Sequence, residues 1–148
     1  MSPLYSNMVK KKLDWNLETD FVLMGFYTQQ RLYRLAWMLN NGINSNFSRV
    51  SDIKLNLHGN SAFSEHHTFI FENEEEEWAL KLVQNQGSLG ILVKHNPAPL
   101  AILKVHGALS RIWLERIELF AKDTIDIQFF EELEIDKIKN KETIIFDV

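Results

Sequence analysis

The sequence predicts an α+β fold: a mostly antiparallel sheet with two main helices packed on one face. Three observations lead to this fold class. Short segments with alternating or continuous apolar residues, which are typical of strands, make up most of the chain. Only two segments repeat their apolar residues at helical spacing. The strand-like segments in the middle follow one another without helices between them, which disfavours a parallel, doubly wound sheet.

The length of 148 residues suits one domain, and we expect residues 1–148 to form it. Residues 1–10 are expected to be a flexible tail. The segment "KKKLDWNLE" then alternates Leu13, Trp15 and Leu17 with polar residues. This period of two predicts a strand with one face in water.

The next segment, "DFVLMGFY" at residues 20–27, is apolar on both faces of a strand. Phe21, Leu23 and Tyr27 share one face, and Val22, Met24 and Phe26 share the other. Such a pattern predicts a central strand that is buried on two sides.

The first helix is predicted within "QQRLYRLAWMLNNG" at residues 29–42. The residues with helical spacing are Leu32, Leu35, Ala36, Leu39 and Ile43. Thr28 is placed to cap the first turn. Asn41-Gly42 is expected to supply the left-handed residue that ends the helix.

Five strands are predicted in the middle of the chain. Residues 52–59 alternate, residues 65–72 and 77–84 flank an acidic connection as a hairpin, and residues 88–94 and 100–107 flank a loop at Pro97-Ala98-Pro99. The second helix is predicted at residues 108–123. Its apolar stripe is Leu109, Ile112, Trp113, Ile117, Phe120 and Ala121. Residues 124–133 and 142–148 are expected to be closing strands.

Two helices are too few to shield the second face of so large a sheet. The segments 21–27, 100–105 and 125–130 carry apolar residues on both faces. Either the sheet curls on itself or a second copy covers it, since large exposed apolar patches normally mark a partner surface. We therefore expect self-association, and a homodimer in particular.

Composition disfavours several classes of function. With a formal net charge of −4, the chain lacks the positive field that attracts nucleic acid. Lys10–Lys12 is the one local basic cluster, and RNA contact through it is a third, least favoured function. The absence of cysteine excludes disulfides, thiolate metal sites and cysteine nucleophiles, and it fits a reducing compartment. No apolar segment has the length of a membrane span, so we expect no membrane contact and a cytoplasmic location.

No catalytic motif or cofactor site is evident, and we expect no catalytic residue, no metal and no cofactor. His66 and His67 are adjacent on a predicted strand and should point to opposite faces, which disfavours a shared zinc ion. The acidic run at residues 74–77 lacks the spacing of a calcium loop. Gly87 and Gly90 precede a predicted strand, so a turn is favoured over a phosphate-binding loop.

One group of side chains on the first predicted helix is a candidate ligand site. Tyr33, Arg34, Trp37 and Asn40 lie on one flank of this helix, and Asp20 begins the preceding strand. They could bind a ligand by stacking and hydrogen bonds. In the alternative that we favour, Trp37 packs, Arg34 pairs with Asp20, and Asn40 helps to finish the helix.

The same residues resemble the start of the IPExxxVDY family, small uncharacterised proteins of the Bacteroidetes group. The matching positions are Asp20, Phe21, Gly25, Tyr33, Arg34, Leu35, Trp37 and Asn40, and "ETIIFD" resembles the closing strand of that family. Residues 93–102 read "VKHNPAPLAI" in place of the segment that names the family, so we expect a divergent member. The resemblance implies a fold layout and a bacterial cytoplasmic setting, without a reaction.

Two functions follow as hypotheses. The first is a noncatalytic cytoplasmic binding or interaction protein that acts as a homodimer, with an unknown protein partner as a further option. The alternative is a small enzyme or ligand sensor with a pocket near Tyr33, Arg34, Trp37 and Asn40.

Overall fold

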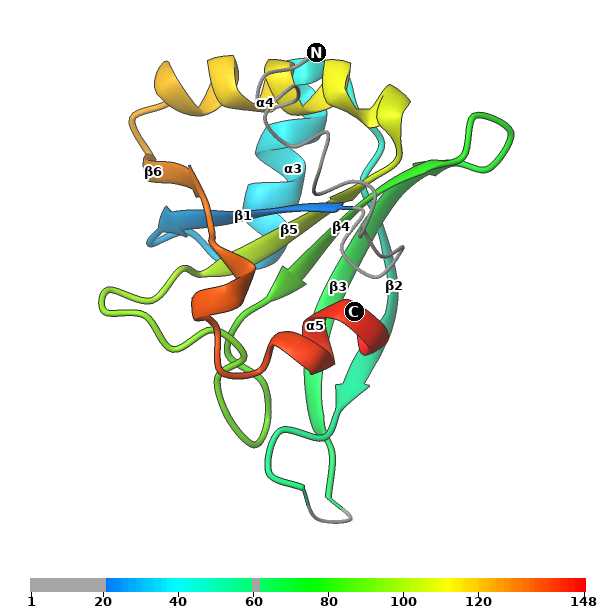
Figure 1. Ribbon diagram of the computed structural model, residues 1–148. Coiled ribbons are helices and arrows are strands. Elements are labelled where there is room, and N and C mark those ends of the chain that lie inside the picture. Colours follow the sequence, from blue (N-terminus) through cyan, green and yellow to red (C-terminus); the bar gives the residue numbers. More distant parts are fainter. Residues whose placement is uncertain (1–20, 60–61) are drawn as a thin grey trace.

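The computed structural model describes residues 21–59 and 62–148, and in this part of the chain a six-stranded antiparallel sheet carries helices on both faces (Figure 1). The strands are β1 (Phe21–Thr28), β2 (Ser48–Leu55), β3 (Ser64–Asn73), β4 (Trp78–Gln84), β5 (Ala101–His106) and β6 (Ile127–Glu132). The helices are α3 (Leu32–Ile43), α4 (Arg111–Lys122) and α5 (Lys141–Asp147), with short 3-10 turns η2 (Ala108–Ser110) and η3 (Ile135–Lys137). The predicted α+β class is confirmed.

The strand order is β2-β3-β4-β5-β1-β6, and every neighbouring pair is antiparallel. β1 lies between β5 and β6 and is buried on both faces, as its continuous apolar run predicts. The hairpin of β3 and β4 around the acidic turn is also confirmed. The predicted strand at residues 10–18, the tail at residues 1–10 and the candidate residue Asp20 lie outside the described residues.

Helices α3 and α4 cover one face of the sheet. Leu35, Leu39 and Ile117 are fully buried there, in a core that also contains Phe26 from β1. Helix α3 thus buries Leu32, Leu35, Ala36 and Leu39 of its predicted stripe. In the second predicted helix the stripe is wrong at its start, because Leu109 on η2 and Ile112 on α4 face solvent. Leu114 is buried instead, so the buried stripe of α4 lies beside the predicted one.

Both predicted ends of the first helix are wrong. No side chain caps its start, and the Thr28 hydroxyl instead accepts the Gln30 amide at 3.1 Å and donates to the Asp126 carbonyl at 2.6 Å. The helix continues through Gly42 and ends at Asn44, which holds the left-handed conformation with φ of 59°. Gly42 serves helix packing, because an added Cβ would lie 2.1 Å from the ring of Phe120 on α4.

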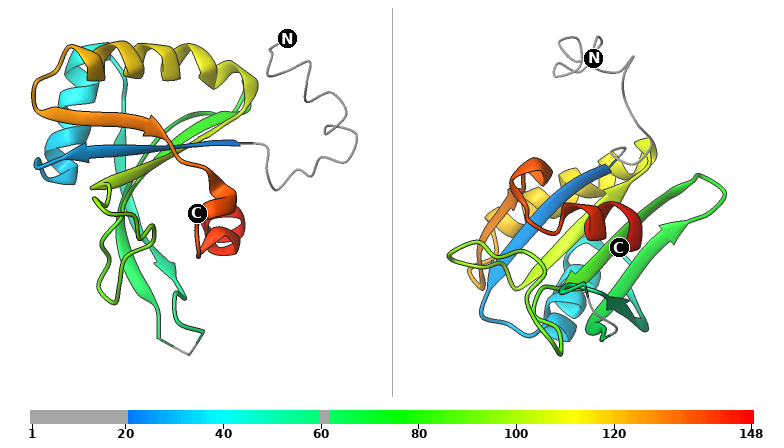
Figure 2. Two further views of the ribbon diagram at one scale, coloured as in Figure 1. Left: turned by 60° about the vertical axis from the view of Figure 1, so that its left-hand side comes forward. Right: turned by 60° about the horizontal axis from the view of Figure 1, so that its bottom comes forward.

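The second face of the sheet is covered by residues 85–100 and 133–148 of the same chain. Figure 2 (left) shows α4 and α5 on opposite sides of β1. The buried apolar side chains of this second core are Leu23, Leu55, Val83, Leu92, Val93, Ile102, Leu133, Ile138, Ile144 and Val148. A second copy is therefore not needed to bury this face, and the argument that led to a homodimer no longer holds for these strands.

Two segments that were predicted as strands, residues 88–94 and 142–148, belong instead to the segments that cover the second face. Residues 88–94 form a loop with one isolated bridge, between Gln86 and Ile91. The buried Asn85 side chain holds that loop, because its amide donates to Val93 and Pro99 carbonyls at 2.9 and 3.1 Å and its oxygen accepts the Val93 amide at 2.7 Å. Residues 142–147 belong to α5 rather than to a strand, which places Ile144 against the sheet.

Candidate functional site

The residues of the predicted site that the structure describes, Tyr33, Arg34, Trp37 and Asn40, lie on α3 but do not form one pocket. Tyr33 and Trp37 are 66% and 52% exposed, so neither belongs to the core. The Arg34 guanidinium stacks on the Trp37 ring with its carbon 4.4 Å from the ring centre. The packing role expected for Trp37 is therefore wrong, since its ring supports an exposed arginine.

Asn40 has a structural role. Its amide donates to the Phe47 carbonyl at 3.0 Å, and its oxygen accepts the Phe47 amide at 2.7 Å and the Ser45 hydroxyl at 2.8 Å. These three bonds fix the connection from α3 to β2. As the packing alternative expects, Asn40 helps to shape the end of the helix.

Tyr33 lines an open groove of about 680 Å³ between the start of α3 and the sheet. The other lining residues are Arg31, Leu32, Arg49, His67, Phe69, Gln84 and Leu100. Of the candidate residues that the structure describes, only Tyr33 reaches this groove; Arg34, Trp37 and Asn40 do not line it. The groove is thus shifted from the predicted flank of α3 toward the start of the helix and the sheet.

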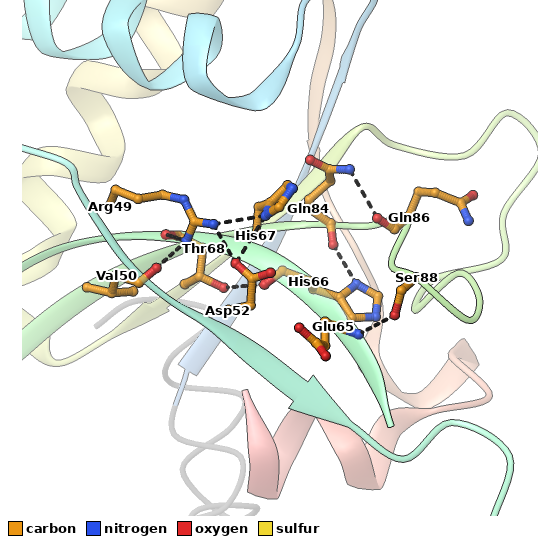
Figure 3. A network of polar contacts seen from close by, with 10 residues as sticks. All are labelled: Arg49, Val50, Asp52, Glu65, His66, His67, Thr68, Gln84, Gln86 and Ser88. Atoms are coloured by element: carbon orange, nitrogen blue, oxygen red, sulfur yellow. Dashed lines mark hydrogen bonds and ion pairs between the residues drawn. The ribbon is translucent and has the colours of Figure 1, made fainter. Parts of the chain in front are cut away.

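A β-bulge in β2 builds one wall of the groove. In a regular strand, residues three apart point to opposite faces, so Arg49 and Asp52 would not meet. The register between β2 and β3 shifts between Val50 and Ile53, and the extra residue brings Asp52 to the face of Arg49 and His67. Figure 3 shows the three side chains converging there.

Asp52 joins the two basic side chains of this wall. Its Oδ1 lies 3.0 Å from His67 Nδ1 and forms an ion pair with the Arg49 guanidinium. Hydrogen bonds from His67 first, and from Arg49 second, hold the pKa of Asp52 below its usual value. Arg49 Nη2 also lies 2.9 Å from His67 Nδ1, so the imidazole either donates to Asp52 or accepts from Arg49.

Arg49 is further held by backbone carbonyls. Its Nη1 donates to Val50 and, at 3.3 Å, to Thr68. Its two terminal nitrogens are thus occupied, and its charge is balanced by Asp52. Arg31 differs, because it is exposed and forms no ion pair within residues 21–59 and 62–148. The net positive charge in the lining of the groove therefore comes from Arg31.

His66 points to the opposite face, as its position next to His67 predicts. It is fully buried, and its Nδ1 donates to the Gln84 carbonyl at 2.8 Å, as Figure 3 shows. Its Nε2 has no hydrogen-bond partner in the described structure. Burial lowers the pKa of His66, so the ring is neutral at neutral pH. Gly87 leaves room for the ring, since an added Cβ there would lie 2.3 Å from Nε2.

The lining of the groove combines polar and apolar side chains. Its lining contains arginine, tyrosine, histidine and glutamine side chains above Phe69 and two leucines, and it contains no serine, threonine or carboxylate. Within the described residues, no cluster of three His, Asp or Glu side chains could hold a metal ion. None of the helices in that part of the chain has the length and apolar character needed to cross a membrane.

Comparisons with known proteins add no assignment. No protein-family model, curated protein or solved structure matches the chain. The resemblance to the IPExxxVDY family accordingly stays a prediction.

Most residues of the groove could not be identified from the sequence pattern. Arg49 and Asp52 come together only through the bulge, and Gln84 and Leu100 come from two further segments of the chain. One signal was available: the alternation predicts that His66 and His67 point to opposite faces of the strand, so that only one of them can face the groove.

Proposed function

We propose that this protein is a noncatalytic binding protein whose groove takes an organic anion, with the anionic group at Arg31 and an apolar or aromatic part on Phe69. The observation that carries the proposal is the groove itself, in which an exposed arginine without an acidic partner in the described chain stands beside an apolar floor. Pockets of this kind, mostly apolar with a few polar groups, are typical ligand sites.

The floor and walls favour a ligand with both characters. Phe69, Leu32 and Leu100 offer apolar contact, and the Tyr33 ring stands exposed at the rim. A guanidinium binds a carboxylate or phosphate through parallel hydrogen bonds. An uncharged ligand would leave Arg31 without a partner, and a cationic ligand would be repelled by it.

Calorimetric titration tests the proposal with phenylacetate, indole-3-acetate and hexanoate, each beside its neutral amide. The acids are expected to bind up to about fivefold more tightly than the amides, because an ion pair with an exposed side chain contributes about 0.2–1 kcal/mol. The variant Arg31→Gln should lose the difference between acid and amide. Arg34→Gln is the matched control, since it removes the same charge from a position three residues further along, outside the groove.

Equal binding of acid and amide would contradict the proposal, and so would equal losses in the two arginine variants. Melting curves of both variants show whether either change disturbs folding. Both side chains are exposed, so we expect melting temperatures close to that of the unmodified protein.

An enzymatic function is the second candidate, and the contact between Asp52 and His67 favours it. A carboxylate that binds Nδ1 can orient an imidazole so that Nε2 acts as a general base. Such an activity would be lost in Asp52→Asn. A ligand that binds the groove without being converted would instead support the binding function.

The homodimer stays part of the proposal, now on the outer face of α4. Ile112 and Leu119 on α4, and Leu109 on the preceding turn η2, are each more than half exposed there. Glu115 and Arg116 lie between them, so two antiparallel copies of the helix can place opposite charges side by side. Light scattering during size-exclusion chromatography should give twice the 17.4 kDa chain mass, and Ile112→Glu should give the monomer. A monomer before substitution would contradict it.

We also place the protein in the cytoplasm and expect no nucleic-acid partner. The lack of cysteine supports the first statement, and the net charge of −4 supports the second.

A further inference from the structure

A second pocket, of about 450 Å³, lies at Tyr27, Phe129 and Glu131, and the loop at His95, Asn96 and Pro97 forms its other side. None of these residues lines the groove described above. We propose that this pocket binds an alkylammonium group, which goes beyond the proposed anion site.

The absence of a side chain at Gly25 shapes the pocket. Gly25 pairs with Glu131 across β1 and β6, and a Cβ on Gly25 would lie 3.3 Å from the Tyr27 ring. The ring therefore lies over the glycine and reaches along the strand pair to Glu131. Tyr27 and Glu131 thus lie on the same face of the strand pair, and both line the pocket.

Burial first, and the Glu131 carboxylate second, raise the pKa of Tyr27 to about 12, so its hydroxyl keeps the proton at neutral pH. Glu131 forms no ion pair within the described part of the chain. The carboxylate is exposed and can accept hydrogen bonds from a cation.

Two aromatic rings stand at right angles beside this carboxylate. Phe129 is paired with Tyr27 across the strands, and their ring planes meet at 89° with centres 6.3 Å apart. Phe129 is 64% exposed, so the ring is available to a ligand. Aromatic faces that meet at an angle attract ammonium groups through their quadrupoles, and a carboxylate adds charge attraction.

The charges of the lining select a cation. Glu131 is the one acid among the lining residues, and no lysine or arginine lines the pocket. An anion would be repelled by Glu131, and a neutral apolar molecule would leave the carboxylate without a partner as it loses water. A quaternary or primary ammonium group satisfies the carboxylate and the rings together.

Two sources share this chemistry: a free amine and a lysine side chain of another protein. NMR titration with choline and with its neutral isostere 3,3-dimethylbutan-1-ol tests the charge requirement. N-acetyl-lysine methylamide and its trimethylated form represent the second source. We expect choline or the lysine derivatives to shift the resonances of Tyr27 and Phe129, and the isostere to bind at least tenfold more weakly.

Variants separate the pocket from general surface attraction. Glu131→Gln removes the charge with little change of side-chain shape and should weaken binding at least tenfold. Glu132→Gln removes the same charge from the adjacent residue, which does not line this pocket, and should change affinity less than twofold. Phe129→Leu replaces an exposed ring and should weaken binding without disturbing the fold.

The probes distinguish a free amine from a lysine side chain, and they can also overturn the proposal. Preference for choline assigns the site to a free amine, and preference for the trimethylated lysine assigns it to a protein side chain. The proposal is overturned when none of the ammonium probes binds at 50 mM, which is on the order of the weakest useful affinity. Equal binding of the isostere, or equal effects of the two glutamate variants, also overturns it.

Discussion

Lys104 on β5 should make the stability of this protein rise between pH 8 and pH 10. Its Nζ donates to the carbonyls of Ile144 and Val148 at 2.9 Å each and to that of Ile145 at 3.3 Å. It also lies 4.6 Å from the centre of the Phe21 ring. A half-buried lysine therefore ties the end of α5 to the second face of the sheet. Cations are favoured at this end of a helix.

The size of the effect follows from the pKa. Burial first, and the charge of Lys81 second, lower the pKa of Lys104 from 10.5 to about 8 in the folded protein. Between these values the unfolded chain binds more protons than the folded one, so the free energy of unfolding increases with pH. The full shift corresponds to about 3 kcal/mol. Partial contact with solvent reduces this to about 1.5 kcal/mol.

Urea unfolding at pH 7.5 and pH 10 measures this gain. We compare the unmodified protein with Lys104→Met, in which the titrating group is absent. The difference between the two pH values should be about 1.5 kcal/mol larger in the unmodified protein than in the variant. An identical pH dependence in both proteins would refute the reasoning, because it would assign the titration to other groups.

Three further substitutions test the packing. Gly42→Ala should destabilise the protein by about 1–3 kcal/mol in urea unfolding, because the added methyl group meets the Phe120 ring, and it should become stabilising in a Phe120→Ala background. Asn40→Ala should lower the free energy of unfolding by about 2 kcal/mol, because the Phe47 backbone groups lose their hydrogen-bond partner. Asn41→Ala removes one exposed hydrogen bond and should lower it by under about 0.5 kcal/mol, so equal losses would contradict the role of Asn40. Asn85→Ala should lower the melting temperature and speed hydrogen exchange at Val93, and unchanged exchange there would contradict its role in holding the loop.

The strands and helices with strong periodicity could be predicted from the sequence. The apolar run of β1, the stripe of α3 and the β3–β4 hairpin each carry their own local pattern, and local pattern agrees with burial there. The end of α3 was misjudged by two residues, because Gly42 looks like a helix stop although its role is to let Phe120 approach.

The cover of the second face could not be predicted from local pattern. Residues 142–148 contain Thr143, Ile144 and Ile145, β-branched residues that favour strands. Tertiary contacts override this preference, since Ile144 packs into the second core and Lys104 binds the helix carbonyls. The loop at residues 85–100 likewise depends on Asn85, whose hydrogen bonds have no signature in the sequence.

The candidate site was predicted only in part for a related reason. Tyr33 was identified because it is an aromatic residue on a helix flank. Arg49 and Asp52 were not, because their meeting depends on a bulge that reverses the alternation of β2. A prediction that assumes a regular strand period cannot bring together residues that meet only through an irregularity of the backbone.

The proposed function depends on binding of an organic anion in the groove beside the start of α3. Its most direct test is an NMR titration of the full chain with indole-3-acetate, with assigned backbone amides and aromatic side chains. We expect the chemical-shift changes to concentrate at Arg31, Tyr33 and Phe69, which line the groove. Saturation with shifts elsewhere, or no shifts at all with any of the acids named above, would contradict it.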